Sequence, residues 1–256
     1  MKRNFVYTAI ILAFTVFFIE LILRLSGIAA TYSEKTLGFF TTYYNQVSTN
    51  LHHTWKPNSE IRYFQEEFQY VRQSNSEGFI EKEFPLKPSD SIDYVFLLGD
   101  SFTEGDGAPM DSNVSSFLEA IFWEEGFTNV RVYNAGTSGS DAAFNYKVLQ
   151  DKLLNLKPKL IICINNESDV EDFITRGGLE RFSEEGVMKT KQAPFGFIFY
   201  RYSIIARLFF HAIGYEEGMM PRHQGKERSK FSKQVADVLI QVNNLSQENN
   251  IECVIV

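Results

Sequence analysis

Cysteine and histidine are scarce in this 256-residue sequence, which contains two cysteines and four histidines. Cys163 and Cys253 each lie in an apolar run, so we expect two buried thiols that pack as small hydrophobic residues. A disulfide framework or a metal site would need closer clusters with histidine partners. His52 and His53 are adjacent, but no third ligand lies near them in the sequence. We therefore expect this pair to pack or to face solvent rather than to bind a metal.

Several common active-site motifs are also missing. A phosphate-binding P-loop needs a lysine after its second glycine, whereas Gly105 is followed by Asp106. The dinucleotide-binding pattern G-x-G-x-x-G follows none of the strands expected below. The stretch 99–103 lacks the final glycine of the α/β-hydrolase nucleophile turn. These absences argue against nucleotide-binding folds and against that hydrolase class.

The sequence has no excess of basic residues. Its formal net charge is −7, and because the first 25 residues carry +2, the remainder carries −9. An acidic domain does not suit a polyanion, so we expect no nucleic-acid partner.

A long apolar run occupies the amino terminus, from Phe5 to Leu25. A membrane-spanning helix needs roughly 20 apolar residues. Lys2 and Arg3 precede the run, which predicts a cytoplasmic amino end and an exported domain. Glu20 would cost about 2.5–3.5 kcal/mol at the bilayer centre. It lies near the end of the run, four residues before Arg24, where pairing and snorkelling reduce that cost.

We interpret residues 1–29 as an uncleaved signal anchor that contacts the membrane through residues 5–25. The main domain would then be extracytoplasmic on a single-pass membrane protein. A cleaved signal peptide is the first alternative, with Ile28–Ala30 as a poor cleavage site, but the run exceeds the usual ~7–15 residue core of such peptides. A buried helix of a soluble protein is the second alternative.

Residues 30–93 are expected to form a connector with a small β element. Alternating apolar and polar residues over 61–79 predict β structure, with a turn at Asn75–Gly78. Pro85 and Pro88 mark a linker into the first core strand.

From residue 94 onward, strands and helices alternate, which predicts an α/β domain over 94–256 with a parallel sheet covered on both faces. The expected strands are Tyr94–Leu98, Val130–Tyr133, Leu160–Ile164 and Ile251–Val256. The expected helices are Ser112–Glu125, Ala142–Leu156 and Phe231–Asn249. Residues 170–230 form an insertion with a helical stretch at Tyr202–Ile213, and we expect this insertion to shape a substrate site.

Ser101 lies where a buried strand hands over to a helix. Gly99 and Asp100 end the strand, and a polar turn follows. In open α/β sheets, ligands bind at the carboxyl ends of the strands. A serine at this position, with glycines nearby, can be exposed and approached by backbone N–H groups.

The stretch Gly99-Asp100-Ser101 resembles the nucleophile motif of the SGNH hydrolases, also called the GDSL family. The resemblance covers about residues 94–256 and implies a three-layer, flavodoxin-like fold. It also implies that Ser101 is the nucleophile, supported structurally by Gly99 and Asp100, in a reaction that needs no metal or organic cofactor.

The same resemblance implies three donors to the oxyanion that forms on an attacked ester. The first is the Ser101 N–H, and the second is the N–H of Gly139, with Gly136 as the alternative. The family carries Gly-x-Asn-Asp after the third strand, where this chain reads Asn166-Glu167-Ser168-Asp169. Asp169 matches, and the third donor is left open among Ser168, Asn166 and, more distantly, Asn165.

The general base of the family, an Asp-x-x-His motif after the last core strand, occurs nowhere in this sequence. We therefore interpret the chain as truncated before that motif, and we expect these 256 residues to be catalytically weak. The resemblance implies a serine esterase or acylhydrolase acting on an extracytoplasmic acyl ester, such as an O-acetylated polysaccharide or peptidoglycan. The alternatives are an acyltransferase on surface glycans and a non-catalytic, membrane-anchored binding protein.

Overall fold

The structure is a computed structural model that describes residues 2–26, 54–55, 57–64, 69–183, 196–214 and 225–256. His52, His53, His223, the cleavage site at residues 28–30 and residues 30–53, 56 and 65–68 of the predicted connector lie outside the described residues. The chain divides into two compact units, one made of residues 1–48 and 189–222 and the other of residues 49–188 and 223–256. Each unit is described by itself. The predicted domain boundaries at residues 29 and 93 stay predictions.

The first unit contains helices α1 (Lys2–Ser26), α7 (Phe197–Tyr202) and α8 (Ile204–Ala212). The segment Asn4–Ser26 of α1 is long and apolar enough to cross a membrane, and a signal sequence would meet the same criteria. The predicted helix at Tyr202–Ile213 is confirmed as α8. Its first turn is capped by Ser203, whose hydroxyl accepts a hydrogen bond from the Ala206 N–H at 3.2 Å. Helix α7 was not predicted.

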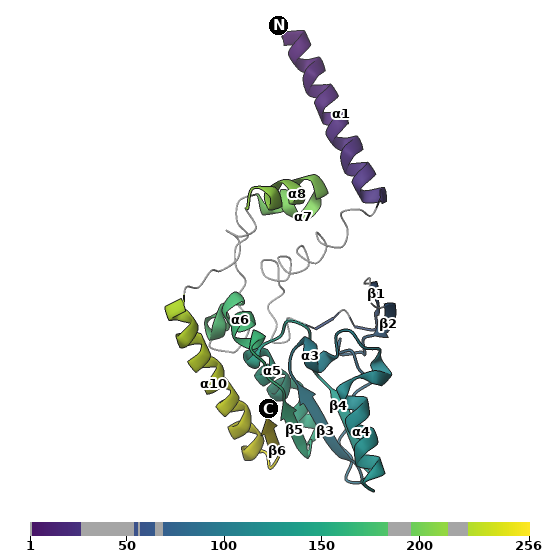
Figure 1. Cartoon of the computed structure of the whole chain (residues 1–256), viewed down its shortest axis with the longest axis vertical. Helices are drawn as coiled ribbons and strands as arrows, with labels where there is room; N and C mark the ends of the chain where they lie inside the picture. The colour runs from purple at the N-terminus through teal and green to yellow at the C-terminus, as the bar shows by residue number, and fades with distance from the viewer. Residues whose placement is uncertain (1, 27–53, 56, 65–68, 184–195, 215–224) are drawn as a thin grey trace. The chain divides into compact units, whose positions relative to one another are not determined.

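The second unit is built on a four-stranded parallel sheet with the order β4-β3-β5-β6 (Figure 1). All four strands agree with prediction to within one residue at each end. They are β3 (Asp93–Leu98), β4 (Val130–Asn134), β5 (Leu160–Cys163) and β6 (Glu252–Ile255). The carboxyl ends of β3, β4 and β5 therefore meet at one edge of the sheet.

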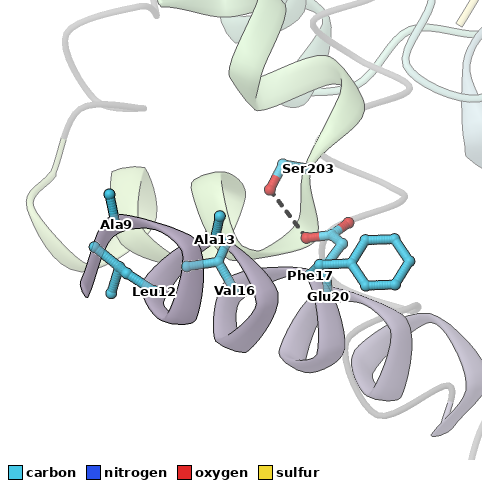
Figure 2. A pocket seen from close by; sticks show the side chains of 7 residues that line it. All are labelled: Ala9, Leu12, Ala13, Val16, Phe17, Glu20 and Ser203. Atoms are coloured by element: carbon cyan, nitrogen blue, oxygen red, sulfur yellow. Dashed lines mark hydrogen bonds between the residues drawn. The ribbon is translucent and has the colours of Figure 1, made fainter. Parts of the chain in front are cut away.

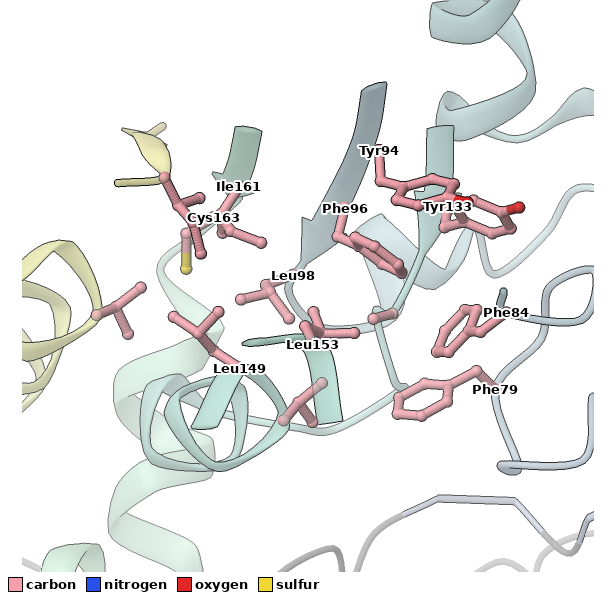
Figure 3. Packing of buried hydrophobic residues seen from close by; sticks show 14 of the residues in the cluster. Phe79, Phe84, Tyr94, Phe96, Leu98, Tyr133, Leu149, Leu153, Ile161 and Cys163 are labelled. Atoms are coloured by element: carbon pink, nitrogen blue, oxygen red, sulfur yellow. The ribbon is translucent and has the colours of Figure 1, made fainter. Parts of the chain in front are cut away.

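Helices cover the sheet because alternate side chains of β3 point to opposite faces. Val95 and Leu97 pack toward α4 (Val114–Glu124), against Leu118 and Phe122. The opposite face packs on α5 (Ala142–Val148), its continuation through residues 149–156, and α10 (Gly225–Glu248). Figure 3 shows this second layer, in which the rings of Phe96 and Tyr133 stack with centroids 5.2 Å apart.

Two expectations about the sheet need correction. Cys163 is fully buried and free, as predicted, but Cys253 is free and only half-buried. It lies on β6, whose Val254 and Ile255 are also partly exposed. Coverage of both faces therefore holds for β3 but not for β6, where Cys253 packs against the core cluster while Val254 and Ile255 stay exposed.

The β element before the sheet is an antiparallel pair, β1 (Glu60–Phe64) and β2 (Gln69–Gln73). The turn predicted at Asn75 follows it. The Asn75 side-chain oxygen accepts hydrogen bonds from the N–H groups of Glu77 and Phe79, both at 3.0 Å. The turn places the side chain of Phe79 in the core, where it is fully buried and packs against Phe84.

Candidate active site

The turn after β3 is built for a close approach between the strand and the following helix. A Cβ atom on Gly99 would lie 2.0 Å from Thr103 Oγ1 and 2.7 Å from the Ile164 carbonyl oxygen, so no other residue fits there. Asp100 caps α3 (Ser101–Glu104) by accepting a hydrogen bond from the Phe102 N–H at 3.0 Å. Ser101 is thereby fixed as the first residue of this short helix.

Ser101 is partly exposed at the carboxyl edge of the sheet. Within the described part of the chain, neither its hydroxyl nor its backbone N–H has a hydrogen-bond partner, while its carbonyl accepts from Gly105 and Asp106. A partly exposed hydroxyl next to an unused N–H is the arrangement that a serine nucleophile and its first oxyanion donor require.

The loop after β4 is joined to this turn through one carbonyl. The Gly99 oxygen accepts hydrogen bonds from the Thr137 N–H at 3.0 Å and from the Ser140 hydroxyl at 2.8 Å. Two of the three segments that the sequence singled out are therefore adjacent in space.

The structure separates the two glycines that the sequence left open. Gly136 is buried, and its N–H already donates to the Asn134 side-chain oxygen at 2.9 Å, so it is not free to bind a substrate oxygen. Gly139 is partly exposed with φ +72°, and no described residue accepts from its N–H. Its carbonyl oxygen accepts hydrogen bonds from Arg176 Nε at 2.9 Å and from Arg176 Nη2 at 2.6 Å. Gly139 is thus the stronger candidate.

The loop after β5 is joined to the turn through the Asp100 carboxylate. Asp100 Oδ2 lies 2.7 Å from Asn166 Nδ2 and 3.1 Å from the Ser168 hydroxyl, which is also 2.6 Å from Asn166 Oδ1. A hydroxyl has one proton, so Ser168 has none left for a substrate, whereas the Asn166 amide has a second N–H. The side chain of Asn165 turns to the Cys163 carbonyl. Of the proposed third donors, Asn166 is the one with spare capacity.

Asp169 is hydrogen-bonded to the backbone of this loop. Its Oδ2 accepts from the Asn166 backbone N–H at 2.6 Å, while its Oδ1 is buried without a partner in the described residues. Burial raises the pKa of Asp169 to about 7, and the negative charge of Asp100 adds to the rise. Asp169 therefore holds a proton more readily than an ordinary carboxyl group.

Two buried ion pairs that sequence reasoning missed hold the loop after β4. Arg181 makes a bidentate contact with Asp141, with both N–O distances 2.7 Å, and both side chains are fully buried. Burial alone would raise the pKa of Asp141, but the charge of Arg181 outweighs this and lowers it. Asp141 also caps α5 through the Ala143 and Phe144 N–H groups.

The second buried pair is centred on Glu104, at the end of α3. Its carboxylate accepts from the Ser138 N–H at 2.7 Å, from Trp55 Nε1 at 3.1 Å and from Arg72 Nη1 at 3.3 Å. Because Ser138 directly precedes Gly139, this carboxylate fixes the loop that carries the candidate donor. Burial raises the pKa of Glu104, and its three partners oppose that rise. The one feature of the sequence that could have pointed to this role of Glu104 is its position three residues after Ser101.

The described residues of the second unit include no histidine, and His211 lies in the first unit. The described residues also hold no group of three histidine, cysteine, aspartate or glutamate side chains that could bind a metal ion. The described site thus has a candidate nucleophile and candidate oxyanion donors but no histidine base.

Comparisons with known proteins give structural neighbours only. No family profile and no curated protein matches this sequence. Among solved structures, AlinE4, described as an SGNH-hydrolase family esterase, shares 16% identity over 65% of this chain and 77% of its own, with a TM-score of 0.32. A lipase/acylhydrolase from Enterococcus faecalis shares 18% over 63% and 75%, with a TM-score of 0.29. The acetyl xylan esterase AlAXEase shares 13% over 63% and 76%, with a TM-score of 0.31. Values this low do not assign the chain to a family.

Proposed function

We propose that this protein is a serine esterase or acylhydrolase of the SGNH type, with a three-layer, flavodoxin-like domain that acts on an extracytoplasmic acyl ester. The observation that carries the proposal is the position of Ser101. Its hydroxyl, to which no described residue is hydrogen-bonded, lies at the carboxyl edge of the sheet, between two loops that are bonded to Gly99 and Asp100. An acylated carbohydrate, such as an O-acetylated polysaccharide or peptidoglycan, suits an exported domain behind an anchor helix.

In this proposal the Ser101 oxygen attacks the acyl carbon, and its proton passes to a base. The negative charge on the former carbonyl oxygen is held by the N–H groups of Ser101 and Gly139 and by the second amide proton of Asn166. The alcohol then leaves with a proton, and water releases the acyl group from Ser101. Asp100 acts as a positioning residue, because its carboxylate holds Asn166 in place.

The general base is the missing part, since the sequence contains no Asp-x-x-His motif. Enzymes that lose their triad retain about 10³–10⁴-fold catalysis over water from the oxyanion hole and binding alone. We therefore expect the 256-residue chain to turn over slowly, with a rate that an added base increases.

Chemical rescue tests this proposal. Hydrolysis of an acetyl ester by the full chain in detergent is measured as imidazole is added, with Ser101→Ala as the reference for hydrolysis by imidazole itself. We expect a rate above that reference that rises with imidazole. Ser89→Ala, at a partly exposed linker serine hydrogen-bonded to Ser91, is the matched control and leaves the rate unchanged. Fast turnover without imidazole would contradict the low basal rate.

A non-catalytic binding protein is the second candidate. It is favoured by one observation, the engagement of both Asn166 and Ser168 with Asp100 in place of a free donor pair. The two candidates differ in their reaction with a fluorophosphonate in the presence of imidazole. Phosphonylation mapped to Ser101 supports the esterase, and an unmodified Ser101 in a folded chain supports the binding protein.

A further inference from the structure

Helices α7 and α8 have the composition of a membrane-surface element. Residues 197–213 read FIFYRYSIIARLFFHAI, with two arginines, one histidine and no acidic residue, in a chain whose net charge is −7. Arg207 is buried, so Arg201 and His211 are the basic side chains of this segment that can face a lipid surface. Apolar, aromatic helices with basic groups bind at the boundary between lipid headgroups and acyl chains, and their positive charge favours anionic lipids.

The two helices dock on α1 through Glu20. The Glu20 carboxylate accepts hydrogen bonds from the Ile204 N–H at 3.0 Å, the Ile205 N–H at 3.1 Å and the Ser203 hydroxyl at 2.9 Å. Arg24, which pairs with Glu20 at 2.7 Å, also donates to the Tyr202 carbonyl. The start of α8 therefore provides three hydrogen-bond donors to Glu20, an acidic side chain in an apolar helix of spanning length.

Figure 2 shows an apolar groove beside this contact, along α1. Its walls are the side chains of Ala9, Leu12, Ala13, Val16 and Phe17, and Glu20 and Ser203 close one end. A groove with a hydrocarbon lining over several turns offers water no partners, whereas a lipid acyl chain matches it.

The face of α7 and α8 that is not used for docking is also apolar. Ile198, Phe199, Tyr202, Leu208, Phe209 and Ile213 are between 43% and 64% exposed. The spanning-length segment of α1 is itself unburied. The exposed apolar surface of α1 therefore continues onto the helix pair, and the same medium would cover both.

We propose that α7 and α8 form a second membrane-contacting element, docked on α1 by Glu20, with their exposed face in the headgroup–acyl boundary of an anionic bilayer. The occupant of this face is lipid. The proposal depends on insertion of α1, and the chemistry of Ser101 plays no part in it.

Depth-dependent quenching tests the proposal on the full chain. The chain is reconstituted in phosphatidylcholine–phosphatidylglycerol vesicles that contain a lipid with a nitroxide on its acyl chain. Single cysteines carry an environment-sensitive dye in a Cys253→Ala background, since Cys163 is fully buried and stays unlabelled. The test position is Phe209→Cys, at 58% exposure, and the matched control is Phe117→Cys on α4, at 59%. Leu12→Cys reports insertion of α1.

We expect the labels at positions 12 and 209 to lose fluorescence to the nitroxide lipid and the label at position 117 to keep it. Phe199→Cys on α7 repeats the test in case the first variant misfolds. Quenching at position 12 with none at 209 and 199 would overturn the proposal. So would a blue-shifted label at 209 that the lipid does not quench, because protein rather than lipid would then cover the face. Failure of quenching at position 12 would overturn the insertion of α1 as well, without touching the esterase proposal.

Discussion

Asp100 connects two parts of the candidate site. One of its carboxylate oxygens caps α3, and the other accepts hydrogen bonds from the loop after β5. The resemblance predicted Asn166 or Ser168 as an oxyanion donor but could not show that the Ser168 hydroxyl lies within hydrogen-bond distance of both Asp100 and Asn166. Hydrogen-bond capacity, rather than residue type, therefore decides between them.

The buried carboxyl of Asp169 makes a prediction about stability and pH. Its pKa is raised from 3.8 to about 7, so the native protein binds this proton more tightly than the unfolded chain does. The stabilisation of the folded state by this bound proton is then complete below pH 4 and is lost as the pH rises to 7. We expect the free energy of unfolding from urea titrations to fall from pH 5 to pH 8 by of the order of 2 kcal/mol more in the wild type than in Asp169→Asn.

Asp172 is the control for that measurement, because burial also raises its pKa, to about 6. Asp172→Asn removes the part of the pH-dependent stability that comes from Asp172. That part is lost about one pH unit lower than the part that comes from Asp169. A difference between pH 5 and pH 8 that is the same in Asp169→Asn and in the wild type would contradict the account.

At the scale of elements, the start of α8 depends on a residue that lies 184 positions away in the chain. The first N–H groups of a helix have no acceptor within the helix, so protection of the Ile204 and Ile205 amides must come from Glu20. We expect Glu20→Ala to speed hydrogen exchange at these two amides by roughly tenfold to a hundredfold, the value of a hydrogen bond to a charged group.

Glu20→Gln is the matched variant for this prediction. Its side-chain oxygen still accepts a hydrogen bond, so protection is lost only in part, and exchange at the end of α8 stays the same in all three proteins. Full protection of both amides in Glu20→Ala would show that something other than Glu20 holds the start of α8.

For the whole molecule, the sheet and its main helices could be predicted because their signals are local. The apolar run 94–98 and the helical spacing of α4 and α10 need no knowledge of distant residues. The element α7 escaped prediction because it is short and apolar on most sides, and α5 continues into a π-helical turn at Leu149–Leu153 that no local pattern marked.

The supports of the site could not be predicted, because they join residues far apart in the chain. Arg72 and Glu104 are 32 positions apart, and Asp141 and Arg181 are 40 apart. In a sequence such residues read as surface charges, since arginine and acidic residues are seldom fully buried. Only the folded chain shows that they are paired and hold the loop of Gly139.

The central claim is that the N–H groups of Ser101 and Gly139 and the Asn166 amide converge on one point beside the Ser101 hydroxyl. The most direct measurement is a crystal structure of the full chain phosphonylated on Ser101 with imidazole present, since the phosphoryl oxygen mimics the oxyanion. The account predicts that this oxygen lies within hydrogen-bond distance, about 2.7–3.1 Å, of all three donors. A phosphoryl oxygen directed to solvent, or bound by the Ser168 hydroxyl instead, would contradict it.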